Sequence, residues 1–301
     1  MRILVTGGTG FIGRALCNSL MSQGHQLTVL TRNGQRLRGL LGENVSPLMQ
    51  LSDWSADMAF DAVINLAGEP IMARRWSDAR KQALLDSRVA LTEQLVERMA
   101  AARQTPAVLI SGSAIGVYGD QGDTQLTEAS VGGTGFSHDL CVQWESVARG
   151  AESLGVRVCL LRTGLVVGKN GGFLEKMLLP FRLGLGGRIG DGHQWMSWIH
   201  LADHVALTRY LLENPGLHGV FNATAPHPVT NAEFTRQLAS VLKRPALFPV
   251  PAWLLTLIAG EMAELLLGSE RVIPERALQA GFTFQFETLE PALRDVVLGS
   301  A

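Results

Sequence analysis

The chain has 301 residues, of which 47% are hydrophobic, and its formal net charge is −1. This size suits one large α/β domain with an extension or two closely packed domains, and the balanced charge gives no electrostatic case for nucleic acid or an anionic membrane as a partner. The three cysteines, Cys17, Cys141 and Cys159, have neither disulfide nor zinc spacing, which favours a reducing, cytoplasmic compartment.

Strand-like and helix-like runs alternate through the first 170 residues. A strand at residues 3–6 runs into a glycine-rich turn, which opens a helix at 14–22. The later runs are strands at 26–31, 61–66, 107–111 and 157–163, and helices at 83–102 and 139–154. Strands separated by helices predict an α/β fold with a doubly wound, Rossmann-like parallel sheet.

The pattern loosens after residue 168. Seven glycines between residues 171 and 192 predict tightly turning loops, and a helix follows at 229–242 with Thr230 or Asn231 as its cap. Residues 252–268 are apolar but contain two glutamates, so we expect an amphipathic helix inside the protein or at a subunit interface, too short to span a bilayer. We expect a Rossmann domain over 1–170 and a smaller substrate-binding lobe over most of 171–301, with segments near 198–224 returning to the Rossmann core.

The turn after the first strand indicates what is bound. Its glycines allow the backbone to approach a pyrophosphate, and the helix that follows offers free N–H groups and the positive end of its dipole. A glycine turn without a ligand is the alternative, but the order of strand, turn and helix favours a dinucleotide. The predicted contacts are Gly7, Thr9, Gly10, Phe11, Ile12 and Gly13.

The second strand distinguishes between the two nicotinamide cofactors. No Asp or Glu occurs from residue 26 to 42, where an NAD-preferring site places the carboxylate that binds the ribose 2′-hydroxyl. Thr31 and Arg32 end this strand instead, and a guanidinium binds a phosphate through two parallel hydrogen bonds. The sequence therefore predicts NADP(H) bound by Arg32, against the alternative of a solvated loop charge.

The strand at 61–66 ends in small residues at the edge where a doubly wound sheet binds ligands. Leu66, Ala67 and Gly68 would let the cofactor pass close to the backbone.

Seven segments together resemble a known family. Those at 6–13 (TGGTGFIG), 65–68 (NLAG), 111–119 (SGSAIGVYG) and 198–204 (WIHLADH) are similar to the extended short-chain dehydrogenase/reductase superfamily, which includes nucleotide-sugar epimerases. Those at 162–168 (RTGLVVG), 179–187 (LPFRLGLGG) and 272–276 (VIPER) resemble an atypical branch, the bacterial epimerase family proteins of the YfcH type. The resemblance covers nearly the whole chain and implies the fold and an NAD(P) cofactor, but it does not specify the reaction.

The resemblance also implies catalytic residues that this chain lacks. In the superfamily a Tyr transfers the proton at the substrate oxygen, and a Lys four residues later lowers the pKa of that Tyr. Of the two tyrosines here, Tyr118 is followed at that distance by Gly122 and Tyr210 by Asn214, so the pair is absent.

Alignment on the family's helix glutamate at Glu145 puts Ser137 at the Tyr position and Cys141 at the Lys position. Serine is a far poorer acid than a phenol, and a thiol carries no positive charge. Cys141 is open to two interpretations, a reactive thiol or an inert buried one.

Other site residues follow from the resemblance. Ser113 stands where the superfamily has its catalytic Ser or Thr, with turn capping as the alternative, and Ser111 would also reach the nicotinamide. The Val-Tyr-Gly context of Tyr118 indicates a side chain packed under the turn. As the only nearby phenol, Tyr118 is also the alternative proton donor. Arg88 replaces a family Asn and would reach the cofactor or an anionic substrate, and Leu165 completes the cofactor set.

Several histidines invite other interpretations. His200, Asp203 and His204 suggest a metal, but they match the superfamily's helix-start segment, so we predict no metal. His138 and Asp139 are alternative acid–base groups.

Two functions stay open. The first is an NADP(H)-dependent oxidoreductase or epimerase that acts on a sugar-like or anionic small molecule through non-standard acid–base residues. The second is a non-catalytic NADP(H)-binding redox sensor or partner-binding protein, so the sequence leaves enzymatic activity undecided. We expect a small-molecule substrate and neither nucleic acid nor a membrane as partner. A homodimer that packs through residues 139–154 and 253–267 stays open.

Overall fold

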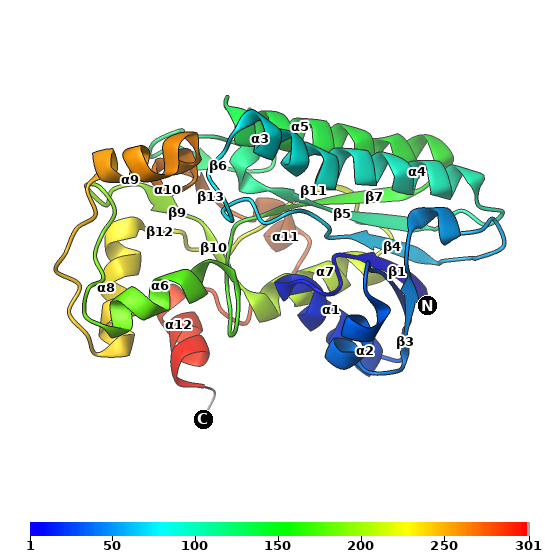
Figure 1. Ribbon diagram of the computed structural model, residues 1–301, viewed down its shortest axis with the longest axis horizontal. Helices are drawn as coiled ribbons and strands as arrows, with labels where there is room; N and C mark the ends of the chain where they lie inside the picture. The colour runs from blue at the N-terminus through cyan, green and yellow to red at the C-terminus, as the bar shows by residue number, and fades with distance from the viewer. Residues whose placement is uncertain (300–301) are drawn as a thin grey trace.

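In the computed structural model, which describes residues 1–299, seven parallel strands form one sheet (Figure 1). Their order across the sheet is β3-β2-β1-β4-β5-β7-β11, so the chain winds outward in both directions from β1. This confirms the predicted doubly wound, Rossmann-like α/β fold. The strands are β1 (Arg2–Thr6), β2 (Gln26–Leu30), β3 (Val45–Leu48), β4 (Ala62–Asn65), β5 (Val108–Ala114), β7 (Arg157–Thr163) and β11 (Gly219–Ala223).

Helices cover both faces of this sheet (Figure 1). Successive strand side chains point to opposite faces, so Val5 of β1 packs with Leu16 below the sheet, whereas Leu4 packs with Leu95 above it. The lower helices are α1 (Phe11–Ser22), α2 (Gly34–Leu41) and α7 (Leu201–Glu213), and the upper ones are α3 (Asp78–Leu85), α4 (Leu91–Ala101) and α5 (Phe136–Arg149).

Some elements differ from the sequence prediction. α1 begins at Phe11, three residues early, because the helix starts directly from the glycine turn with Gly10 at its cap. The helix predicted at 83–102 begins at Asp78, where the Ser77 hydroxyl accepts a hydrogen bond from Arg80 N, and it contains a π turn over Asp86–Ala90. α2 and β3 were not predicted.

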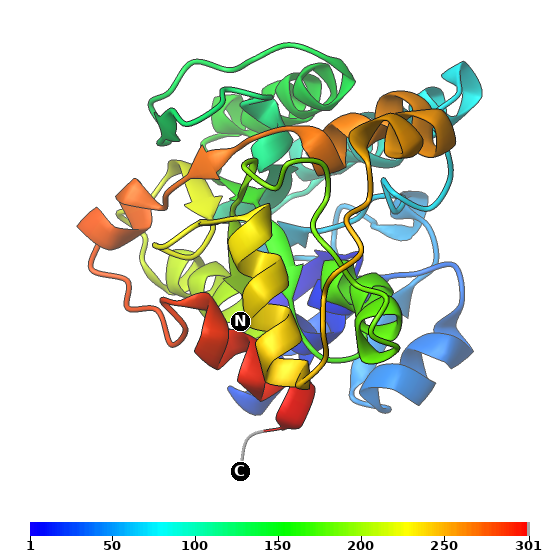
Figure 2. The same cartoon turned by 90° about the vertical axis from the view of Figure 1, so that its left-hand side faces the viewer.

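A smaller lobe lies beside the carboxyl edge of the sheet, and Figure 2 faces it with α8 at the centre. Its core joins α6 (Gly172–Arg182), α8 (Asn231–Leu242) and α12 (Leu289–Leu298) around the buried side chains of Trp198 and Phe234. α6 lies where loops were predicted, whereas Thr230 caps α8 as expected by accepting a hydrogen bond from Glu233 N.

The remaining elements link the lobe to the sheet. No helix within residues 1–299 is long and apolar enough to cross a bilayer. The short strand pairs are β8 (Leu165–Val167) with β10 (Trp198–His200), β9 (Trp195–Met196) with β12 (Val229–Thr230), and β6 (Gln125–Leu126) with β13 (Arg271–Val272). The other helices are α9 (Ala252–Ala259), α10 (Glu264–Leu267) and α11 (Glu275–Gln279).

Candidate functional site

A cavity of about 900 Å³ lies between the carboxyl edge of the sheet and the lobe. Gly7 after β1, Leu66 after β4 and Ser113 near the end of β5 contribute to one wall, and the lobe contributes β9 and α10 to the other. The strand order reverses at β1, and such a reversal is where doubly wound sheets bind ligands. The cavity is therefore the candidate site.

The glycine turn has a tight backbone that leaves no room for side chains, as a pyrophosphate site requires. Gly7 has a φ of +70°, and a Cβ added at Gly13 would lie 2.1 Å from the Gly7 carbonyl oxygen. Gly10 caps α1 without a side-chain hydrogen bond, so the first N–H groups of the helix face the cavity free of a side-chain partner. Free N–H groups at a helix N-terminus bind anions, and the residues present thus suit a dinucleotide.

The structure brings ten of the predicted site residues to the cavity wall. The other six do not line it: Thr9, Thr31, Arg32, Ala67, Ser111 and Tyr118. Those that line it are Gly7, Gly10, Phe11, Ile12, Gly13, Leu66, Gly68, Arg88, Ser113 and Leu165.

Arg32 lies exposed just beyond the end of β2, beside the glycine turn. Leu30 of β2 pairs with Thr6 of β1, which places Arg32 close to the start of that turn. Within residues 1–299 Arg32 forms no ion pair, so its guanidinium is free to take an anion. Thr31 is tied to the loop through its hydroxyl, which accepts a hydrogen bond from Asn33 N at 3.2 Å.

Arg88 places a cation in the wall of the cavity. Its guanidinium lies 5.4 Å from the centre of the Trp144 ring and donates to the Glu69 carbonyl oxygen at 2.9 Å. Burial lowers the pKa of Arg88. It is the only Lys or Arg among the lining residues that the structure describes.

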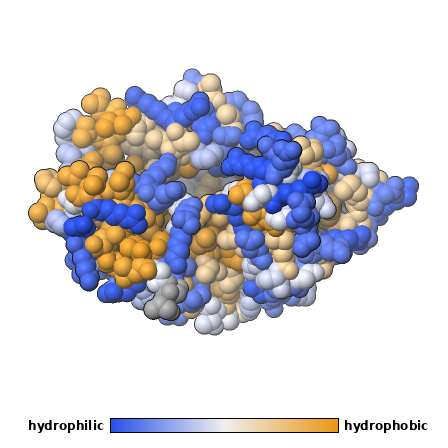
Figure 3. Space-filling model, turned by 60° about the horizontal axis from the view of Figure 1, so that its bottom comes forward, coloured by the Kyte–Doolittle hydropathy of each residue, from blue (hydrophilic) through white to orange (hydrophobic). Residues whose placement is uncertain are grey.

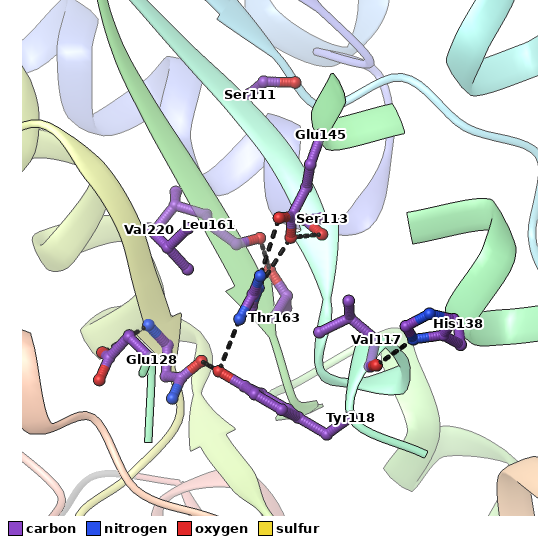
Figure 4. Close-up of polar contacts among 12 residues, drawn as sticks. Ser111, Ser113, Val117, Tyr118, Glu128, His138, Glu145, Leu161, Thr163 and Val220 are labelled. Carbon is purple, nitrogen blue, oxygen red and sulfur yellow. Dashed lines mark hydrogen bonds and ion pairs between the residues drawn. The ribbon is translucent and has the colours of Figure 1, made fainter. Parts of the chain in front are cut away.

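Ser113 belongs to a buried polar network (Figure 4). Its hydroxyl donates to Glu145 Oε1 at 2.7 Å, and the same carboxylate accepts from Arg162 Nε at 2.8 Å and Nη2 at 2.9 Å. The Ser113 proton is thus committed to Glu145, and the oxygen lone pairs remain to accept a hydrogen bond in the cavity.

Tyr118 closes the far end of that network (Figure 4). Its hydroxyl donates to Asn222 Oδ1 at 2.7 Å and accepts from Arg162 Nη1 at 3.0 Å. The side chain is fully buried outside the cavity wall, and burial raises its pKa. The alternative proton donor is therefore held away from the site.

The two residues at the positions of the family's Tyr and Lys both line the cavity. The Ser137 hydroxyl donates to Glu264 Oε1 at 2.7 Å. Burial raises the pKa of the Cys141 thiol to about 12, so this group is neither a cation nor a reactive thiolate at neutral pH.

Sequence reasoning missed Glu270, which lines the cavity. Its backbone is fixed because Ser197 Oγ donates to the Glu270 carbonyl oxygen at 2.7 Å, whereas its carboxyl accepts no hydrogen bond from residues 1–299. Burial, together with the negative charges of Asp120 and Glu264, raises the pKa of Glu270 to about 8. A carboxyl group that is protonated near neutral pH can donate a proton in this cavity.

Of the other candidates, His204 lines the cavity, and His200, Asp203, His138 and Asp139 do not. His200 accepts from Ala202 N at 3.2 Å as the cap of α7, and the Asp203 carboxylate accepts from two backbone N–H groups at 2.7 and 2.9 Å. His204 lines the cavity, where burial lowers its pKa to about 4. His138 Nδ1 lies 2.6 Å from the Val117 carbonyl oxygen, and neither it nor its neighbour Asp139 lines the cavity.

Known proteins resemble this chain along its whole length. Residues 3–223 match the NAD dependent epimerase/dehydratase family, and residues 250–296 match a domain of unknown function, DUF1731. Epimerase family protein YfhF of Bacillus subtilis is 36% identical over 99% of this chain and 98% of its own length; the chloroplastic epimerase family protein SDR39U1 homolog of Arabidopsis thaliana is 39% identical over 99% and 87%. The crystal structure of human epimerase family protein SDR39U1 (isoform 2) with NADPH is 34% identical, covers 100% of both chains and superposes with a TM-score of 0.90.

Proposed function

The chain belongs to the NAD dependent epimerase/dehydratase family, and from that premise we propose that it is an NADP(H)-dependent oxidoreductase or epimerase with a non-standard proton-transfer group. The observation that carries the proposal is that one cavity joins the glycine turn to Glu270, whose carboxyl group has no hydrogen-bond partner within residues 1–299. The human relative crystallised with NADPH supports the choice of cofactor.

Different residues of the chain bind different parts of the cofactor. The N–H groups at the start of α1 take the pyrophosphate, and Arg32 takes the 2′-phosphate. Leu66, Gly68 and Leu165 border the cofactor, and Ser113 accepts a hydrogen bond near the reacting carbon. When bound, the nicotinamide supplies or accepts hydride.

We assign the proton transfer to Glu270 in place of the family's Tyr. In a reduction, the protonated carboxyl gives its proton to the substrate oxygen and becomes a carboxylate, which solvent then reprotonates. Asp120 and Glu264 lie beside Glu270, and Arg88 is the only Lys or Arg that lines the cavity within residues 1–299. The cavity around Glu270 therefore suits a neutral, hydroxyl-bearing substrate better than an anionic one.

Replacing Arg32 with Asp is expected to weaken NADPH binding by about 1–3 kcal/mol, roughly 5–150-fold in Kd, because a charge-assisted phosphate contact is lost. NADH binding should change little, since NADH lacks the 2′-phosphate. Titration by nicotinamide fluorescence measures both. Arg149→Asp, on an exposed turn of α5, controls for the change in net charge. Equal NADPH affinity in Arg32→Asp and the wild type would remove Arg32 from the site.

Glu270 is expected to make the stability of the fold depend on pH. Because its pKa in the folded state lies near 8 rather than at the ordinary 4.5, the folded protein holds a proton in this window that the unfolded chain has released. The free energy of unfolding should therefore fall as pH rises from about 4.5 to 8, with a slope of up to about 1.4 kcal/mol per pH unit from this group.

Urea denaturation of Glu270→Gln at several pH values tests this expectation, since the variant should lose that slope. Glu287→Gln, at an exposed position, should keep it. Parallel pH profiles for Glu270→Gln and the wild type would contradict the protonated state on which the assignment depends.

The second candidate is a non-catalytic NADP(H)-binding protein, favoured by the neutral Ser137 and Cys141 at the two catalytic positions. Incubation with NADPH and a panel of neutral hydroxyaldehydes and hydroxyketones separates the two. The enzyme is supported if the wild type oxidises NADPH and the Glu270→Gln variant binds NADPH but no longer oxidises it. Tight NADPH binding without oxidation across the panel supports the second candidate.

A further inference from the structure

The lobe carries exposed apolar side chains at the end farthest from the sheet. They come from three segments: the end of α6 with its following loop, the loop after α8, and α9. Each of the six that define this surface, here called the apolar end, is 58–74% exposed: Leu183, Leu185, Leu247, Phe248, Trp253 and Leu257. Figure 3 shows apolar side chains gathered over the lobe. Monomeric proteins rarely leave so many large apolar groups together in water.

Backbone hydrogen bonds join these segments into one surface. Val250 N donates to the Arg188 carbonyl oxygen at 2.8 Å, and Gly190 N donates to the Val250 carbonyl oxygen at 2.9 Å. α9 begins two residues after Val250. The apolar end is therefore built on a fixed pair of loops and a helix.

The apolar end is rich in basic residues, and one of them, Arg188, has an acidic neighbour in Asp191. Residues 176–190 and 243–258 contain five basic residues and neither Asp nor Glu, although the whole chain has a net charge of −1. Within residues 1–299, Arg182, Arg188, Lys243 and Arg244 make no salt bridge, and each is exposed. The net charge of the whole chain is therefore close to zero, although this local surface is both apolar and cationic.

The combination of apolar and cationic side chains indicates which partner contacts the apolar end. A second copy packed on the same face would bring like charges together, which is destabilising, whereas an anionic lipid surface neutralises the cations and receives the apolar side chains at its headgroup boundary. α9 has eight residues, enough to lie in that boundary and too few to span it. We propose that the apolar end docks the protein on the surface of an anionic lipid bilayer.

Sedimentation with vesicles tests the proposal on the full-length protein. Binding is expected to vesicles of phosphatidylcholine mixed with phosphatidylglycerol, to be much weaker with phosphatidylcholine alone, and to fall as salt rises. Arg182→Glu with Arg244→Glu should reduce binding at least about tenfold, and so should Leu247→Ser with Phe248→Ser. Arg98→Glu with Arg103→Glu, on and just beyond α4, should bind as the wild type does.

NADPH titration shows that each variant is folded, because none of the changed residues lines the cavity. Three results would overturn the proposal: absence of binding to anionic vesicles, equal binding to neutral ones, or a dimer in solution that the same substitutions at the apolar end dissociate. The docking surface and the proposed activity fail independently, since vesicle sedimentation does not measure NADPH oxidation.

Discussion

Glu145→Ala is expected to lower the free energy of unfolding by about 3–5 kcal/mol, because it leaves the Arg162 guanidinium buried without its counter-ion. The Glu145 and Arg162 side chains are 8% and 12% exposed, and two hydrogen bonds of 2.8 and 2.9 Å join them. The same change frees the Ser113 hydroxyl and removes the charged neighbour that orients Arg162 toward Tyr118.

Urea denaturation followed by circular dichroism measures the loss. Glu152→Ala is the matched control, because it breaks a pair with Arg149 whose side chains are 51% and 42% exposed, and a surface pair contributes at most about 1 kcal/mol. If both variants lose the same small amount, the network around Glu145 does not support the fold as described here.

The hydrogen-bond network around Glu145 shows why the sequence did not predict part of the site. Ser113 was predicted from the resemblance to the superfamily. Its partner Glu145 is on α5 and Arg162 is on β7, so their contact depends on how the strands and helices assemble. Tyr118 and Asn222 meet across 104 positions of the chain. No local spacing indicates such pairs.

Glu270 is a similar case. It directly precedes β13, whose pairing with β6 brings it beside Asp120 and the cavity. A lone glutamate followed by a short strand has no motif, and only the fold places it in the cavity wall with acidic neighbours. The unusual pKa is therefore a property of the assembled site.

The parts that sequence did predict are local. A strand, four glycines and a helix occupy the 21 residues from 2 to 22 and specify the phosphate-binding turn by their own conformations. The prediction of loops from the seven glycines was wrong for α6. The glycines at 171 and 172 lie at the start of this helix and those at 184–192 follow it, so a helix fits between them. Leu174 and Phe181 hold that helix against the lobe core.

Gly13→Ala is expected to weaken NADPH binding at least about 100-fold, because the backbone of the phosphate-binding turn must move. The added Cβ would lie 2.1 Å from the Gly7 carbonyl oxygen and 2.8 Å from the Gly8 Cα, both backbone atoms that cannot rotate away. The turn must open, and the N–H groups that receive the pyrophosphate move with it. Isothermal titration with NADPH gives the affinity directly.

Gly39→Ala is the matched control, because it lies in α2 with no atom within 4 Å of its added Cβ. That variant should bind NADPH normally and gain about 0.5–1 kcal/mol in stability, as Ala does in a helix. Wild-type affinity in Gly13→Ala would mean that the turn tolerates displacement, and the pyrophosphate contact would then have to be assigned elsewhere. Loss of binding in a Gly13→Ala variant that still unfolds cooperatively instead ties the cofactor to the backbone of this turn, since the substitution removes no side chain that could have bound it.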